Sequence, residues 1–314
     1  MKPNPELIFR PETHGFYGAY YPAAQSSDAV MLYMLGPTAD SVLVKMGVRW
    51  LHRLGCHVLA LSPEPEHPDF AELPVERFGA AIRQMQAMGM RRFGVCGGSI
   101  HGMLALIAAS TCPEITLTIA MSPCDFVAEG FIRDGLDGSG ERPADGKAVV
   151  SRNGQSLPYL PYAYRHPDYD RELKAEAKRG GNLAASREMF DRAELLHPLQ
   201  EEEFIPVEQI QGTLLLVGAR DDCLWDTEKY IRRMEARLRN RGGACQCRCL
   251  LYDHGTHFLF PQSLLTGTLP VGSFLLPMAF REGRKHPFAC KQARIDFDRQ
   301  VQSALHRWMN HQEA

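Results

Sequence analysis

The chain has 314 residues, 45% hydrophobic and 23% charged, which is enough apolar material for a sizeable core in one or two domains. Its net charge of −2 argues against nucleic-acid binding driven by an excess of basic residues. The apolar stretches are too short to span a bilayer, and no apolar leader follows the N-terminus. Nine scattered cysteines fit reduced thiols. We therefore expect a cytoplasmic protein that binds neither nucleic acid nor membrane.

The first 124 residues alternate short apolar runs, typical of buried strands, with segments whose apolar residues recur at helical spacing. The strands that we expect are Leu7–Phe9, Gly15–Tyr21, Ala29–Leu35, Cys56–Leu61, Arg92–Cys96 and Ile115–Met121. The helices that we expect between them are Asp40–Leu54, Pro74–Met88 and Met103–Ser110. This alternation indicates a mostly parallel sheet with helices on both faces.

The pattern breaks after Pro123 and resumes near residue 212. The intervening residues 125–211 are rich in Gly, Pro, Arg and Glu, and we expect them to form a mostly helical cap inserted into a core of residues 1–124 and 212–314. The elements expected after the insertion are the strands Gly212–Val217 and Gln246–Tyr252 and the helices Thr227–Arg241 and Gln292–Met309.

The most informative segment is FGVCGGSIHGMLA, residues 93–105, in which a strand, a serine flanked by glycine and a helix follow one another. This order is typical of a nucleophile elbow, where a strained turn exposes the Ser99 hydroxyl and the helix N-terminus supplies N–H groups for an oxyanion. One feature departs from the usual G-x-S-x-G pattern. His101 stands where the second glycine belongs, and Gly102 follows it.

A rival register makes Cys96 the nucleophile, because residues 94–98 read G-x-C-x-G. That register would shorten the preceding strand to about three residues and would place Gly102 inside a helix, where glycine costs about 1 kcal/mol relative to alanine. The sequence therefore favours Ser99, while a glycine-rich loop without chemistry remains the alternative.

An acid and a histidine follow Ser99 in the order expected for a hydrolase triad, each after a later strand. The candidates that follow the two strands of the C-terminal part are the acids Asp221, Asp222 and Asp226 and the bases His254 and His257. Residue spacing alone leaves six pairings open.

The segments FIPVE (204–208), LLVG (215–218), the Asp-Asp pair with Trp225, and GTH (255–257) resemble the C-terminal catalytic domain of the acyl-CoA thioesterase and bile acid-CoA:amino acid N-acyltransferase family. The likeness extends from about residue 28 to the last helix. It implies the α/β-hydrolase fold. It also implies a nucleophile at Ser99, an acid at Asp222 and a base at His257, and a small-molecule ester or thioester substrate that resembles an acyl-CoA.

The mechanism needs two oxyanion donors, for which we expect the backbone N–H groups of Ile100 and Thr38. Tyr159 and Tyr162 are equally interpretable as lining of a substrate pocket or as packing of the cap. For His101, a packed, hydrogen-bonded helix residue is favoured over a pocket group. Cys245, Cys247 and Cys249 alternate on one strand, but small buried thiols are a better interpretation than a metal site. We expect no metal and no organic cofactor.

The leading hypothesis is a serine hydrolase of the ester or thioester class. The alternatives are an acyltransferase or a peptidase that uses the same residues, and a catalytically silent protein of the same fold in which His101 crowds the turn. The acyl chain, the leaving group and the oligomeric state are left open by the sequence.

Overall fold

A computed structural model describes residues 3–24, 27–134, 140–266 and 276–310. Their central feature is an eight-stranded sheet, in which the strands lie side by side in the order β1, β2, β4, β3, β6, β7, β12, β13. The first two pairings, β1 with β2 and β2 with β4, are antiparallel, and every pairing from β4 to β13 is parallel. The strands of this sheet are β1 (Leu7–Phe9), β2 (Gly18–Tyr21), β3 (Ala29–Met34), β4 (His57–Leu61), β6 (Arg92–Gly98), β7 (Ile115–Met121), β12 (Thr213–Ala219) and β13 (Gln246–Tyr252).

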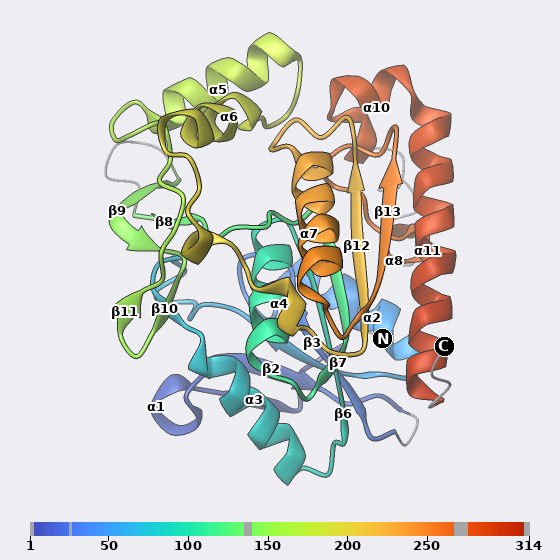
Figure 1. Cartoon of the computed structure of the whole chain (residues 1–314). Helices are drawn as coiled ribbons and strands as arrows, with labels where there is room; N and C mark the ends of the chain where they lie inside the picture. Colours follow the sequence, from blue (N-terminus) through green and yellow to red (C-terminus); the bar gives the residue numbers. More distant parts are fainter. Residues whose placement is uncertain (1–2, 25–26, 135–139, 267–275, 311–314) are drawn as a thin grey trace.

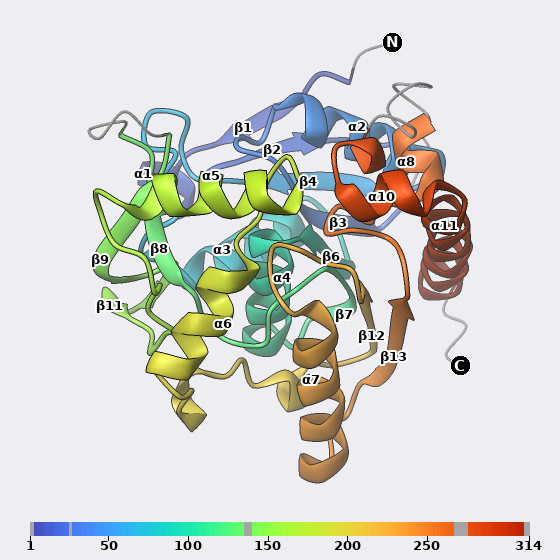
Figure 2. The ribbon, with the colours of Figure 1, turned by 90° about the horizontal axis from the view of Figure 1, so that it is seen from above.

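Helices cover both faces of the sheet (Figures 1 and 2). One face packs against α3 (Glu76–Ala87), α4 (Ile100–Thr111) and α7 (Thr227–Arg241). The other face packs against α2 (Val42–Arg53), α8 (Gln262–Thr266) and α11 (Pro287–Met309). Along β3 the side chains alternate between the two hydrophobic clusters, as the two-residue period of a strand requires. The predicted fold class, an α/β-hydrolase sheet with helices on both faces, is confirmed.

The described residues of the inserted segment, 125–134 and 140–211, form strands before they form helices. The strands are β8 (Glu129–Ile132), β9 (Arg142–Ala148), β10 (Val150–Arg152) and β11 (Gln155–Ser156), and β10 also pairs with β5 (Leu73–Pro74) of the preceding region. The helices are α5 (Tyr169–Gly180), α6 (Arg187–Leu196) and the short turns η1 (Glu201–Glu203) and η2 (Val207–Gln209). The sequence missed these strands because their polar residues and glycines give no apolar alternation. Figure 1 shows α5 and α6 at the end of the sheet toward which β12 and β13 point.

Several boundaries differ from the predicted ones. A short helix, α1 (Pro11–His14), occupies the approach to β2, and Gly15 ends it with φ 77°, so the strand begins only at Gly18. The last helix begins at Pro287, a residue type suited to the first helical turn, and a further short helix, α10 (Arg281–Lys285), precedes it. Within the described residues, no helix is both long and apolar enough to cross a membrane.

Candidate active site

Ser99 occupies the sharp turn between β6 and α4. Its backbone has φ 61° and ψ −128°, a region that non-glycine residues rarely adopt. The turn is tied to the neighbouring strand because the Ser99 N–H donates to the Met121 carbonyl at 2.8 Å. Backbone strain of this kind persists only where the surrounding structure enforces it, and it is concentrated at functional sites. Helix α4 begins at Ile100, three residues earlier than predicted.

Two glycines allow the strand and helix to approach at this turn. A Cβ atom at position 97 would lie 2.1 Å from the His101 carbonyl oxygen, and one at position 102 would lie 2.9 Å from the Met121 carbonyl oxygen. Both distances are too short for a side chain, so glycine is required two residues before and three residues after Ser99. The departure from the usual pattern therefore leaves the turn intact, because the second close approach falls on Gly102 and not on position 101.

The side chain of His101 is buried on the face of the sheet that packs against α3 and α4. Its ring meets Phe70 edge to face at 5.1 Å and lines a small cavity of about 10 Å³ together with Arg77. Burial lowers the pKa of His101 to about 4, so the ring is neutral near pH 7. Its Nε2 atom has no hydrogen-bond partner in the described residues. Of the two interpretations, the packed helix residue fits this environment, and the ring has a hydrogen bond with the Gly98 backbone.

Cys96, the rival nucleophile, lies within β6 and is fully buried. Burial raises the pKa of its thiol to about 12, which disfavours the reactive thiolate. The structure therefore brings Ser99, and not Cys96, to the histidine described next.

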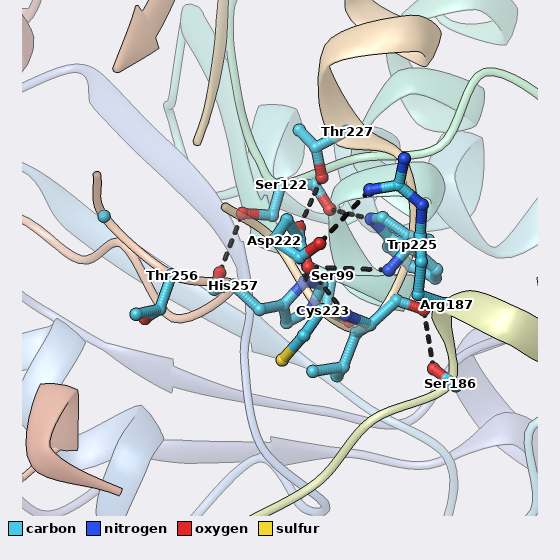
Figure 3. A network of polar contacts seen from close by, with 12 residues as sticks. Ser99, Ser122, Ser186, Arg187, Asp222, Cys223, Trp225, Thr227, Thr256 and His257 are labelled. Carbon is cyan, nitrogen blue, oxygen red and sulfur yellow. Dashed lines mark hydrogen bonds and ion pairs between the residues drawn. The ribbon is translucent and has the colours of Figure 1, made fainter. Parts of the chain in front are cut away.

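His257 lies in the loop after β13 and joins Ser99 to Asp222 (Figure 3). Its Nε2 is 2.7 Å from Ser99 Oγ, and its Nδ1 is 2.8 Å from Asp222 Oδ2 and 3.0 Å from Oδ1. The His257 and Asp222 side chains are fully buried. Water is thus kept from the imidazole–carboxylate contact, and the histidine has one nitrogen directed at each partner.

The carboxylate of Asp222 is held by its own loop. Oδ1 accepts from the Leu224 N–H at 2.8 Å and from the Trp225 N–H at 3.4 Å, while Oδ2 accepts from the Thr227 hydroxyl. Thr227 is the first residue of α7. None of these donors was predicted from the sequence, although a hydroxyl residue at a helix start five residues after the acid is a usable signal.

A second group of residues fixes the loop that carries His257. The Ser122 hydroxyl donates to the His257 carbonyl at 2.7 Å, and the Trp225 indole N–H donates to the Ser122 carbonyl at 3.1 Å. The Trp225 ring also meets the imidazole edge to face at 5.2 Å. Ser122, which sequence reasoning also missed, thereby links the end of β7 to both the acid loop and the histidine loop.

The remaining acids and the second histidine have other partners. Asp221 accepts from the N–H groups of Gly255 and Thr256 at 3.1 and 2.8 Å and lies 3.3 Å from His254 Nδ1. Burial raises the pKa of Asp221. Asp226 caps α7 by accepting from the Lys229 N–H at 3.0 Å. Of the six pairings left open by the sequence, only Asp222 with His257 forms a hydrogen-bonded chain with Ser99.

Four further predicted residues have distinct surroundings. Ile100 is the first residue of α4, where a backbone N–H has no acceptor within the helix. The Thr38 hydroxyl donates to Asp40, and Thr38 lies in the loop after β3. Tyr162 packs against Tyr169 and Phe190 at 5.8 and 5.7 Å, and Tyr159 is half-buried against the same cluster. The packing role thus accounts for Tyr162, whereas its role in a pocket stays a prediction.

Among the described residues, no group of three or more His, Cys, Asp or Glu side chains is arranged to hold a metal ion. Cys247 and Cys249 lie 3.8 Å apart between their sulfur atoms on β13. This pair packs against α7 and its neighbours, as expected for small thiols on a half-buried strand face.

Comparison with known proteins agrees with the fold. A Pyrococcus horikoshii acylaminoacyl peptidase is 10% identical with a TM-score of 0.51, and the match covers 94% of this chain but only 39% of the peptidase. The Pyrococcus furiosus esterase Pf2001 is 14% identical with a TM-score of 0.47, and the match covers 98% of both chains. None of the curated proteins compared with the chain matches it.

The family described as "BAAT / Acyl-CoA thioester hydrolase C terminal" matches residues 142–264. This segment begins in β9 and ends in α8, so it includes the acid loop and the histidine loop but not Ser99. The predicted resemblance is confirmed over residues 142–264, which match the BAAT / acyl-CoA thioester hydrolase C-terminal family, and the fold is that of the α/β-hydrolases.

Proposed function

We propose that the chain is a serine hydrolase that cleaves an ester or thioester, with Ser99 as nucleophile, His257 as general base and Asp222 as the acid behind the base. The observation that carries this proposal is the chain of hydrogen bonds from Ser99 Oγ through the imidazole to the carboxylate, at 2.7 and 2.8 Å. The strained backbone of Ser99 supports it, because the turn directs the hydroxyl away from the sheet.

In this mechanism the Ser99 oxygen attacks the carbonyl carbon of the substrate while its proton passes to His257 Nε2. The resulting oxyanion accepts hydrogen bonds from the N–H groups of Ile100 and Thr38. Collapse of the tetrahedral intermediate breaks the bond to the leaving group, which takes the proton from His257 and leaves an acyl-enzyme. Water, deprotonated by the same histidine, then releases the acid and restores the Ser99 hydroxyl.

The substrate class that we propose is a small-molecule ester or thioester of the acyl-CoA type. The support for the thioester is the family match over residues 142–264, whose description names acyl-CoA thioester hydrolases. No metal is required, because the imidazole supplies the base and backbone N–H groups supply the charge stabilisation.

A fluorophosphonate probe tests the nucleophile. We expect wild-type protein to be labelled and the Ser99→Ala variant to remain unlabelled, because only an activated serine reacts at a useful rate. Ser303→Ala, a change at an exposed serine of α11, is the matched control and should label as wild type does. If wild type is not labelled, or if Ser99→Ala is labelled equally, the proposed nucleophile is wrong.

The same acyl-enzyme could transfer its acyl group to an amine instead of to water. The family match supports this second function, because its description names BAAT beside acyl-CoA thioester hydrolases. Product analysis distinguishes the two reactions. Incubation with acyl-CoA of several chain lengths and p-nitrophenyl esters, with and without an amine, should give free acid in both conditions if the protein is a hydrolase. Formation of an amide as the main product would instead assign acyl transfer.

A further inference from the structure

The start of α6 contacts the loop that presents Asp222. Three successive carbonyls of this loop, at residues 222, 223 and 224, accept hydrogen bonds from Ser186 or Arg187 (Figure 3). The Cys223 carbonyl accepts from the N–H groups of both residues at 3.2 Å, and the Leu224 carbonyl accepts from the Ser186 hydroxyl at 2.7 Å. These donors come from the inserted segment and the acceptors come from the core.

The Arg187 guanidinium spans the same loop. One nitrogen lies 3.3 Å from the Asp222 carbonyl oxygen, and another binds the carboxylate of Asp226. Asp226 also caps α7. The arginine therefore ties the first residue of the loop to its last, and its side chain is about one-third exposed (31%).

The planarity of the peptide bond connects these contacts to the catalytic carboxylate. The Cys223 carbonyl shares its peptide plane with the Leu224 N–H, which donates to Asp222 Oδ1 at 2.8 Å. The Leu224 carbonyl shares its plane with the Trp225 N–H, which donates to the same oxygen at 3.4 Å. When Ser186 and Arg187 hold the two carbonyls, they orient the two N–H groups that hold the carboxylate.

We propose that Ser186 and Arg187 are positioning residues for Asp222, so that the start of α6 belongs to the catalytic apparatus and the inserted segment does more than cover the site. This inference rests on the proposed function, because it assigns a role relative to Asp222. Neither residue touches the reacting atoms. Ser186 and the Arg187 backbone N–H act through the peptide planes of residues 223–225, whereas the Arg187 side chain acts at the two ends of the loop, on the Asp222 carbonyl and on Asp226. A carboxylate that can tilt within its loop would orient His257 less well, and small misplacements in such arrays slow the chemical step.

The test compares Arg187→Met with Arg179→Met. Arg179 also belongs to the inserted segment and pairs with Glu188 at 2.5 Å, but it does not contact the acid loop. With a p-nitrophenyl ester, we expect Arg187→Met to lower kcat by about 10- to 100-fold while KM stays within about twofold, as expected when orientation and not binding is lost. Arg179→Met should leave both parameters within about twofold of wild type.

Two further variants separate positioning from folding. Arg187→Lys keeps a cation that can reach Asp226 and should recover most of kcat, and Ser186→Ala, which removes a single hydrogen bond, should lower kcat while the thermal midpoint stays close to that of Arg179→Met. If Arg187→Met unfolds at the assay temperature, the Ser186→Ala result decides. A kcat equal to wild type in both Arg187→Met and Ser186→Ala would overturn the inference. The proposed function fails separately, if wild-type protein does not react with the fluorophosphonate.

Discussion

At the scale of single residues, the position of glycine decides which sequence can form the turn at Ser99. The backbone of His101 passes within contact range of position 97, while position 102 faces the Met121 carbonyl. Position 101 itself points toward Phe70, where a large ring fits. The functional constraint is therefore the absence of Cβ at the two points of closest approach, and a pattern that fixes the second glycine at position 101 is too narrow for this chain.

His101 makes the stability of the fold depend on pH. Its pKa is about 4 in the folded chain because burial disfavours the charged ring, whereas an unfolded histidine has a pKa near its ordinary value of 6.5. The unfolded state therefore binds more protons between pH 4 and 6.5. The neutral His101 ring therefore contributes fully to the free energy of unfolding above pH 6.5. This contribution, on the order of 3 kcal/mol, is lost as the pH falls toward 4.

His101→Phe tests this contribution. A phenyl ring keeps the contact with Phe70 but cannot be protonated, so the variant should lose less unfolding free energy than wild type between pH 7 and 4.5. Urea unfolding at several pH values measures the difference. Parallel curves for wild type and His101→Phe would contradict the assignment.

At the scale of elements, the strands of the eight-stranded sheet and the motif were predictable, because most of these strands are buried on both faces and leave apolar runs in the sequence. Ile115–Met121 and Gln246–Tyr252 were predicted with the bounds that the structure has. The start of α4 was not, because Gly102 reads as a helix breaker and its packing against Met121 is invisible in the sequence. Likewise, spacing could not choose among three acids and two histidines, since the choice depends on loop conformations that bring Asp222 alone to His257.

Helix α7 carries several arginines, and they do not all face solvent. Arg233 instead binds both oxygens of Asp125 at 2.7 and 2.6 Å and also reaches Glu194. The Asp125 side chain is buried, and burial raises its pKa to about 6 despite the arginine. The ion pair therefore joins α7 to the first residue of the inserted segment at a site where an unpaired carboxylate is costly.

Arg233→Met should destabilise the chain by about 3 kcal/mol at pH 7, because it leaves the buried carboxylate of Asp125 without its cation. Arg232→Met is the matched control. Arg232 is the preceding residue, is 55% exposed and pairs with Glu228 within the helix, so its loss should cost no more than about 0.5 kcal/mol. Denaturant unfolding of both variants measures the difference. Equal stabilities of the two variants would show that the Asp125 pair adds nothing.

At the scale of the whole molecule, the inserted segment and the sheet share one hydrophobic cluster. Phe126 meets Tyr230 of α7 edge to face at 5.2 Å, and Phe190 of α6 meets Trp225 at 5.3 Å. Both contacts join residues of the insertion to residues of the C-terminal part of the core. The division into a core and a cap therefore describes the order of segments along the chain. That the two fold as separate units stays a prediction.

We expect the insertion and the core to unfold together, because separating them would expose this cluster and break the contacts of Ser186 and Arg187 with the acid loop. Trp225 reports the junction, whereas Trp50 lies in the cluster on the opposite face of the sheet. A variant with Trp50 and Trp308 replaced by Phe reports Trp225 alone, and Trp225→Phe reports the other two tryptophans. The two fluorescence signals and far-ultraviolet circular dichroism should show the same urea transition. A Trp225 signal that changes at clearly lower urea than the other two would instead show that the insertion detaches first and is an independent lid.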